Sequence, residues 1–225
     1  MDYLEPCQYS TRLIEKLKSL DTEEVLDFKL IDKAIYWAKK YHDGQFRKSG
    51  EPYYTHPLEV AYIVSEYKLK TDVIVTAILH DIVEDTEVTA GMILDEFGRR
   101  IEEMVDRLTR DRPDGSKLSV ETILNNVYEK GDKEVLLIKV VDRLHNMQTI
   151  DAKSPEKQKK MIKQILKQFI GYCLYLEEKD IIHRIYREIN IRLPSNLGCR
   201  TSITTPPLSF LSQDFRNDII QKYTH

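Results

Sequence analysis

Apolar side chains recur at helical spacing along most of this chain, and no segment of alternating polar and apolar residues is longer than a few positions. Leu30, Ala34, Trp37, Ala38 and Tyr41 show the pattern, because residues three and four apart share one face of a helix. Glycine and proline, which end or bend regular elements, number only 8 each in 225 residues. The sequence therefore predicts an all-α fold, with too few breakers for a sandwich or barrel.

Helix signals continue to about residue 190 and stop beyond Leu193. Residues 1–193 are predicted to form a single helical domain with extra C-terminal helices at 154–190, and residues 194–225 a tail rich in proline, serine and threonine with room for one short helix. One helix is expected from about Val73 to Asp85. Residues 110–117, with a proline and a glycine among charges, are expected to form a surface loop. Helix starts are predicted at Thr55 with Pro57, Thr71 or Asp72, Thr89, Asp132, and Ser154 with Pro155.

Charge and cysteine content limit the partners and the compartment. The 34 basic and 37 acidic residues leave a formal charge of −3, so there is no overall positive field for binding nucleic acid. No apolar stretch is long enough to span a bilayer, and the N-terminus does not resemble a signal peptide. Three distant cysteines without a Cys-x-x-Cys motif argue against disulfides and thiolate metal sites. We therefore expect a cytoplasmic protein with no nucleic-acid or membrane partner, in which a local site binds any anionic ligand.

His80 and Asp81 end an apolar stretch, and Glu84 and Asp85 follow each of them by four residues. Four residues make about one helical turn, so the imidazole and the three carboxylates are expected to lie close together. Carboxylates crowded in a buried place stay ionised only beside positive charge, which a bound cation supplies. An exposed acidic helix end with one core histidine is the competing interpretation.

Two more polar residues stand out from their apolar surroundings. Asp142 directly follows the apolar run that begins at Val135, where a carboxylate needs a partner. A salt bridge to Lys139 or Arg143 would also satisfy it. His56 lies at a predicted helix start and, taken alone, is as well explained by a structural role.

Together, these residues form a plausible ligand set for one divalent ion. His56, His80, Asp81 and Asp142 offer two imidazoles and two carboxylates, and leave positions for water and substrate. Ligands of this kind suit manganese or ferrous iron, and zinc also remains open. A bound ion of this kind lowers the pKa of its water and polarises a phosphoryl oxygen.

Three segments around these residues resemble the HD-domain metal phosphohydrolases and, in more detail, the hydrolase half of the RelA/SpoT alarmone enzymes. They are the segments RKSGEPY, HDIVEDT and KVVDRLHNM, which begin at Arg47, His80 and Lys139, with His56 between the first two. The resemblance extends from about residue 31 to residue 150. Nothing after Ile150 is similar to the family's synthetase motifs, so the chain resembles a stand-alone small hydrolase.

The resemblance implies a manganese-dependent hydrolase that acts through a metal-activated water. Its reaction removes the 3′-diphosphate, as pyrophosphate, from guanosine tetraphosphate or pentaphosphate to give GDP or GTP. The residues that match the family fall into three groups: metal ligands His56, His80, Asp81 and Asp142; the catalytic pair Glu84 and Asp85; and the nucleotide contacts Arg47, Lys48, Ser49, Asn146 and Thr149.

Two other functions are consistent with the same residues. One is an HD-domain phosphohydrolase for another nucleotide, such as a phosphorylated dinucleotide cofactor or a nucleoside monophosphate. The other is a catalytically silent module that only binds an alarmone. The sequence leaves open the oligomeric state, the resident metal and the preference between tetraphosphate and pentaphosphate.

Overall fold

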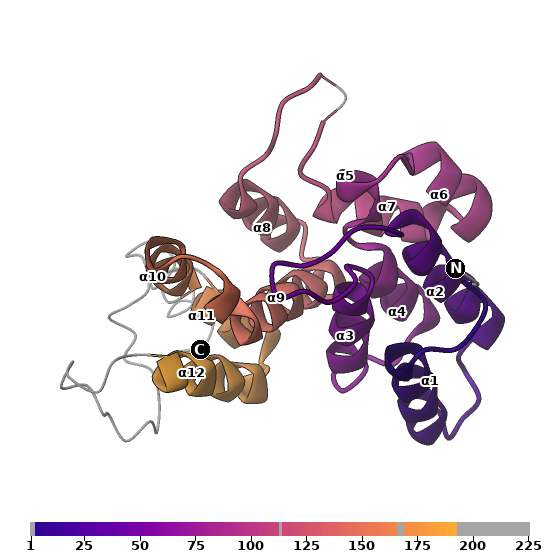
Figure 1. Cartoon of the computed structure of the whole chain (residues 1–225), viewed down its shortest axis with the longest axis horizontal. Helices are drawn as coiled ribbons and strands as arrows, with labels where there is room; N and C mark the ends of the chain where they lie inside the picture. The colour runs from indigo at the N-terminus through magenta and orange to yellow at the C-terminus, as the bar shows by residue number, and fades with distance from the viewer. Residues whose placement is uncertain (1–2, 113, 166–168, 193–225) are drawn as a thin grey trace. The chain divides into compact units, whose positions relative to one another are not determined.

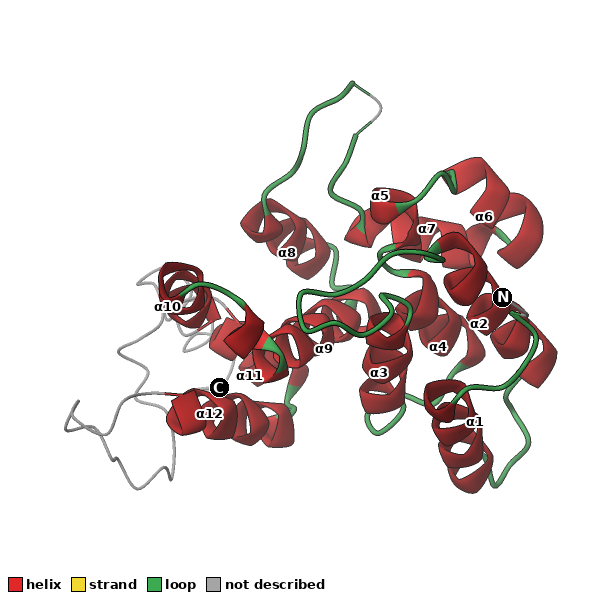
Figure 2. Ribbon diagram, in the orientation of Figure 1, coloured by secondary structure: helices red, strands yellow, loops and turns green. Residues whose placement is uncertain are grey.

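The computed structural model describes residues 3–112, 114–165 and 169–192, and over these ranges the chain is helical, without a β-strand (Figures 1 and 2). The all-α prediction is confirmed. Two isolated β-bridges, Phe46 with Pro52 and Asp111 with Lys117, close two loops. The helices are α1 (Gln8–Leu20), α2 (Phe28–Tyr41), α3 (Thr55–Val64), α4 (Thr71–Leu79), α5 (Ile82–Asp85), α6 (Ala90–Phe97), α7 (Arg99–Leu108), α8 (Val120–Glu129), α9 (Lys133–Gln148), the short 3₁₀ helix η1 (Ile150–Ala152), α10 (Pro155–Gln164), α11 (Ile170–Leu176) and α12 (Lys179–Arg192).

The chain divides into two compact units, Met1–His145 and Asn146–His225. The boundary falls inside α9, whereas the sequence analysis expects one domain up to residue 193. That single-domain assignment stays a prediction. The expected tail, residues 194–225, lies outside the described residues.

Helix α4 is at the centre of the first unit. Its residues from Val73 to Leu79 are all buried, and it packs against α2, α3 and α7. A helix that is apolar on every side is stable only when other elements surround it. The C-terminal end of α4, where His80 follows, therefore lies in the interior of this unit.

The helix expected from Val73 to Asp85 is interrupted, so this prediction is wrong. Helix α4 ends at Leu79, and α5 begins only at Ile82. Between them Asp81 has φ −105° and ψ −5°, and its carbonyl accepts hydrogen bonds from the amides of Glu84 and Asp85, at 3.1 and 3.0 Å. The turn directs the Asp81 side chain toward the imidazoles described below. Apolar spacing continues across the turn, which is why the spacing did not reveal it.

Predicted helix caps have mixed outcomes. Thr89 accepts a hydrogen bond from the Met92 amide at 3.3 Å, and Asp132 accepts one from Val135 at 3.1 Å, as expected. Thr55, in contrast, is the first residue of α3 and donates its hydroxyl proton to Pro52 at 2.8 Å. Helix α4 begins at Thr71, after Lys70 at the cap position.

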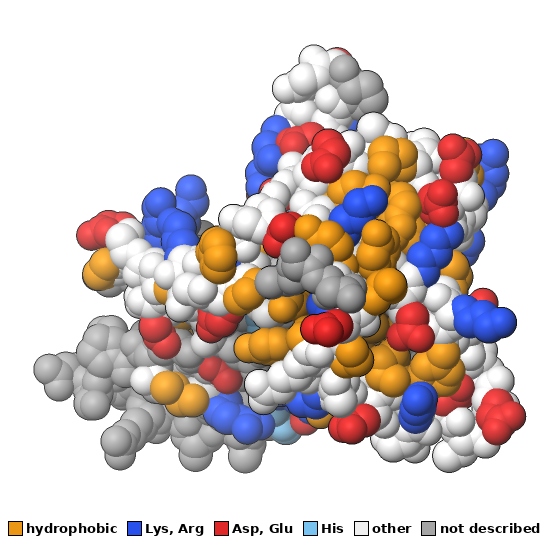
Figure 3. Space-filling view, turned by 45° about the vertical axis from the view of Figure 1, so that its right-hand side comes forward, with side chains coloured by type: hydrophobic (Ala, Val, Ile, Leu, Met, Phe, Trp, Pro, Cys, Tyr) orange, Lys and Arg blue, Asp and Glu red, His pale blue; other side chains and the backbone are white. Residues whose placement is uncertain are grey.

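In the second unit, α10 begins at Pro155 after Ser154, as predicted, and α11 packs against α12. The interior of this pair includes Cys173, Ile181 and Ile185, all fully buried. Among the described residues, no helix of either unit is both long and apolar enough to cross a bilayer. On the face drawn in Figure 3, acidic and basic side chains are interspersed, as the small net charge leads one to expect.

Candidate metal centre

Four predicted ligands meet in the interior of the first unit. The Nε2 atom of His56, on α3, lies 3.3 Å from Asp142 Oδ1, on α9, and 3.5 Å from Asp81 Oδ2. The Nε2 atom of His80 lies 3.1 Å from Asp81 Oδ2 and 3.8 Å from Asp142 Oδ1. Ligand atoms of His56, His80 and Asp142 all lie within 4.8 Å of one another. The structure thus brings together all four residues, which we call the metal cluster.

The hydrogen bond of His80 determines which ring nitrogen faces the carboxylates. Its Nδ1 atom lies 2.8 Å from the backbone carbonyl of Ala77, and only a protonated nitrogen can donate to a carbonyl. Nε2 is buried and has no hydrogen-bond partner of good geometry in the described part of the chain. A buried imidazole nitrogen of this kind, directed at carboxylates, fits a metal ligand.

His56 is oriented in the same way through a second histidine. Arg47 Nη1 lies 3.1 Å from His145 Nδ1, and a guanidinium can only donate, so His145 Nδ1 is an acceptor. The 2.7 Å contact between the Nδ1 atoms of His56 and His145 is therefore a donation by His56. Burial, with the nearby His56 and Arg47, lowers the pKa of His145 to about 3, so this ring is neutral. The Nε2 atom of His56 is left to face Asp81 and Asp142.

The two Nε2 atoms and the two carboxylates need a positive charge among them. Without an ion, a proton provides it: burial lowers the pKa of His80, but Asp81 and Asp142 raise it overall, to about 9. A divalent cation can take the place of that proton, because two imidazole nitrogens and two carboxylate oxygens are common ligands for such ions. The cluster is therefore a candidate site for a divalent metal.

The salt bridge considered as an alternative for Asp142 is also present. Lys139 Nζ lies 3.1 Å from Asp142 Oδ2, on the oxygen that does not face His56 and His80. Burial raises the pKa of Asp142, but the ammonium of Lys139 and the positive charge of His80 hold it well below its usual value. Asp142 thus stays ionised and has one oxygen directed toward the cluster.

The predicted catalytic pair lies at the edge of the cluster. The Glu84 side chain is 10% exposed and lies 3.1 Å from Lys117 Nζ, which also contacts Asp111 at 2.8 Å. Asp85 is exposed, and its Oδ2 accepts a 2.7 Å hydrogen bond from the hydroxyl of Tyr53. An exposed acidic helix end, the competing interpretation, thus describes Asp85 but not the more enclosed Glu84.

The predicted nucleotide contacts of the first unit lie on a short loop that we call the 45–53 loop. It is closed by hydrogen bonds from the amide of Arg47 to Glu51, at 2.8 Å, and from that of Tyr53 to Gln45, at 2.9 Å. Gly50, with φ +101°, adopts a backbone conformation that other residues rarely take. Arg47 is partly buried and reaches the metal cluster through His145, whereas Lys48 and Ser49 are exposed at the tip.

Asn146 and Thr149 belong to the second unit. Asn146 is on the last turn of α9, and Thr149 directly follows that helix. Their contact with a nucleotide stays a prediction.

Four further residues take part in the site but received no functional role from the sequence. Tyr53 and His145 lie within the quoted motifs, where they could have been noticed, and Lys139 precedes Asp142 by one helical turn. Lys117, on the charged loop after α7, has no local signal that connects it with Glu84.

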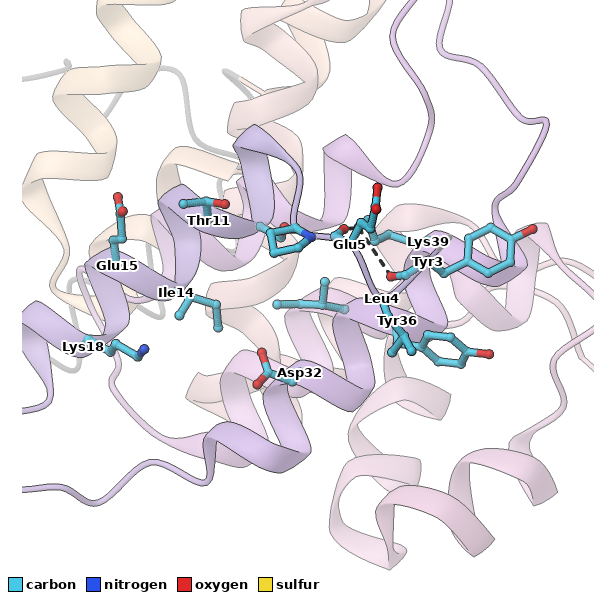
Figure 4. A pocket seen from close by; sticks show the side chains of 13 residues that line it. Tyr3, Leu4, Glu5, Thr11, Ile14, Glu15, Lys18, Asp32, Tyr36 and Lys39 are labelled. Atoms are coloured by element: carbon cyan, nitrogen blue, oxygen red, sulfur yellow. Dashed lines mark hydrogen bonds between the residues drawn. The ribbon is translucent and has the colours of Figure 1, made fainter. Parts of the chain in front are cut away.

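A separate cavity of about 520 Å³ lies between the N-terminal segment, α1 and α2 (Figure 4). Lys39 on its wall donates to the backbone carbonyls of Tyr3 and Glu5. None of the predicted metal, catalytic or nucleotide residues lines this cavity.

Comparison with known proteins identifies a domain in the same part of the chain. A family model described as the HD domain matches residues 34–118. A solved structure of a metazoan ortholog of SpoT, whose description states that it hydrolyses ppGpp, covers 84% of this chain and 97% of its own, with a TM-score of 0.51 and 19% identity. At that identity the likeness concerns the fold alone.

Curated relatives have closer sequences. A GTP pyrophosphokinase of Myxococcus xanthus is 40% identical over 152 residues, which are 62% of this chain and 20% of the relative. A guanosine-3′,5′-bis(diphosphate) 3′-pyrophosphohydrolase of Haemophilus influenzae is 36% identical over 151 residues, 65% of this chain and 22% of the relative. The bifunctional (p)ppGpp synthase/hydrolase SpoT of Escherichia coli K12 is 34% identical over 145 residues, 61% of this chain and 20% of the relative.

This chain therefore spans about a fifth of the length of the curated relatives that it matches. Residues 34–118 match the family model of the HD domain, and the chain is similar in sequence to the proteins named above.

Proposed function

We propose that this protein is a guanosine-3′,5′-bis(diphosphate) 3′-pyrophosphohydrolase. It would remove the 3′-diphosphate, as pyrophosphate, from guanosine tetraphosphate or pentaphosphate and leave GDP or GTP. The observation that most supports this reaction is the buried metal cluster, which is connected to Asp85 through the hydroxyl of Tyr53 and to Arg47 through His145. The names of the relatives agree with it. A cytoplasmic location is part of the same proposal.

His56, His80, Asp81 and Asp142 would hold one divalent ion, and we propose manganese. When bound, such an ion supplies Lewis acidity, which lowers the pKa of a water molecule and polarises a phosphoryl oxygen. The four side chains contribute two negative charges to balance it. Lys139, on the outer oxygen of Asp142, fixes the direction of that carboxylate.

Glu84 and Asp85 are the groups placed to handle protons. Their carboxylate oxygens can orient the attacking water, accept its proton and return a proton to the 3′ oxygen that leaves. Lys117 keeps Glu84 in one orientation, and Tyr53 donates to Asp85.

The 45–53 loop supplies the positive charge for the nucleotide. The guanidinium of Arg47 can stack on a base or bind a phosphate with two hydrogen bonds, and Lys48 adds a point charge. Ser49, Asn146 and Thr149 add polar contacts in this proposal. A few residues thus bind a polyanion, although the net charge of the chain is −3.

The decisive experiment combines metal analysis with pyrophosphate release by the purified chain. We expect the manganese-loaded protein to release pyrophosphate from guanosine tetraphosphate, and the Asp81→Asn variant to lose both metal and activity. Release from none of the guanosine polyphosphates would overturn the proposal. Parallel assays with a nucleoside monophosphate and a phosphorylated dinucleotide test the other phosphohydrolase function, and tight alarmone binding without turnover would identify a silent module.

A further inference from the structure

One hydroxyl group joins the metal cluster to the catalytic pair. The phenol oxygen of Tyr53 lies 3.0 Å from Asp81 Oδ2 and 2.7 Å from Asp85 Oδ2. Burial, followed by the charges of Asp81 and Asp85, raises the pKa of Tyr53 well above its usual value. The hydroxyl therefore stays protonated at neutral pH, and its one proton is shared between these two carboxylate oxygens.

The position of the Tyr53 ring is fixed from several sides. Its ring lies 4.8 Å from that of the buried His42, centroid to centroid, and His42 in turn contacts Gln45 at 2.9 Å. The backbone amide of Tyr53 donates to Gln45, and the Gln45 side chain donates to the backbone carbonyl of Asp85 at 2.7 Å. The 45–53 loop thus contacts Asp85 twice. The Tyr53 hydroxyl contacts its carboxylate, and the Gln45 side chain donates to its backbone carbonyl.

Asp81 and Asp85 need such a contact, because like charges one helical turn apart repel each other. Asp85 is exposed, and in the described part of the chain the hydroxyl of Tyr53 is the one side-chain donor recorded for its carboxylate. Asp81 Oδ2 is also the oxygen that lies nearest to His80 and His56. A donor between the two carboxylates offsets their repulsion and limits the rotation of each.

We propose that Tyr53 is a positioning residue that holds the ligand carboxylate of Asp81 toward the imidazoles and the carboxylate of Asp85 toward the substrate. The part of this inference that concerns Asp85 rests on the proposed function. The part that concerns Asp81 requires only that the cluster binds a metal. In this proposal Tyr53 acts through the two aspartates that its hydroxyl contacts.

The test compares Tyr53→Phe with Tyr53→Ala in the full chain. Phenylalanine keeps the ring contact with His42 and removes only the hydroxyl. We expect Tyr53→Phe to lower kcat and Mn²⁺ affinity by about 10- to 100-fold, the usual effect of losing a group that orients a metal ligand, with little change in KM. Tyr53→Ala should then have a kcat and a Mn²⁺ affinity only slightly lower than those of Tyr53→Phe. If Tyr53→Phe matched the original protein in kcat and Mn²⁺ affinity while Tyr53→Ala lost activity, the ring alone would matter and the proposal would be overturned.

The neighbouring Tyr54→Phe variant is the matched control, because the Tyr54 hydroxyl interacts with Cys7, outside the site. It should retain Mn²⁺ affinity and kcat, and an equal loss in both variants would contradict a specific role for Tyr53. Calorimetric titration of Mn²⁺ into the metal-free proteins requires no substrate. If the original chain hydrolysed no alarmone, the proposed function would fail, while the Mn²⁺ titration would still decide the role of Tyr53 toward Asp81.

Discussion

His80 in the metal cluster is 1% exposed, whereas Lys117, which contacts Glu84 at the edge of the same site, has a side chain that is 48% exposed. In the interior, each charge has an opposite charge close by, because water cannot solvate it there. At the edge, water can replace a lost partner. Removing one partner of an ion pair should therefore lower the stability of the protein much more in the interior than at the edge. Substitutions in the two regions can test this difference.

Asp142→Asn should have the largest effect. It removes one of the two negative charges of the metal cluster and leaves the Lys139 ammonium buried without the carboxylate that it contacts, which typically costs about 3–5 kcal/mol. We expect loss of Mn²⁺ binding and of hydrolysis together with this loss of stability, measured by calorimetry and urea denaturation. If this variant bound Mn²⁺ as tightly as the original protein, losing a charge in the interior would matter no more than losing one at the edge, and the comparison would fail.

Glu84→Gln should affect the rate but not the metal. The proposed role in proton transfer predicts a fall in kcat of about 10²- to 10⁴-fold. Mn²⁺ affinity should stay near that of the original protein, since Glu84 lies outside the metal cluster. A rate assay and a Mn²⁺ titration on the same preparation measure both, and a parallel loss of metal would place Glu84 among the ligands.

Adding Mn²⁺ should stabilise the protein, by about 2.7 kcal/mol when its free concentration is a hundred times the Kd.

Mn²⁺ binding should also depend on pH, because Mn²⁺ competes with the proton on His80, whose pKa without metal is raised from 6.5 to about 9. The stability due to that proton is complete below pH 6.5 and is lost as the pH rises through 9. Mn²⁺ should therefore bind more tightly at pH 9 than at pH 7, and release protons at pH 7. Calorimetry in buffers with different ionisation enthalpies measures this release, and its absence would contradict a protonated His80.

Lys117→Met should have the smallest effect, because its contacts with Glu84 and Asp111 are partly exposed. Pairs of this kind contribute about 0.2–1 kcal/mol to stability. We expect a change in that range by urea denaturation, unchanged Mn²⁺ affinity and only a modest change in kcat. A loss as large as that of Asp142→Asn would remove the distinction between the two regions.

The interior of the site could be predicted from sequence because polar residues stand out where an apolar pattern surrounds them. His80 and Asp81 end the apolar α4, and Asp142 follows a buried run on α9. The edge could not be predicted in this way, since its contacts join residues far apart in the chain. Lys117 contacts Glu84, which lies on a different element, and no local pattern in the sequence indicates that they meet. The turn between α4 and α5 was missed because the apolar spacing is the same on both sides of it.

The Nδ1 atom of His145 accepts hydrogen bonds from both His56 and Arg47. A nucleotide phosphate that binds Arg47 would compete with His145 for the guanidinium and so alter the hydrogen bonding of the ring that orients His56. Metal occupancy and nucleotide occupancy would then be thermodynamically linked, and each ligand would change the affinity of the other by the same factor. A comparison of Mn²⁺ affinity with and without a non-hydrolysable guanosine polyphosphate would measure this factor, and equal affinities would show that the two sites are independent.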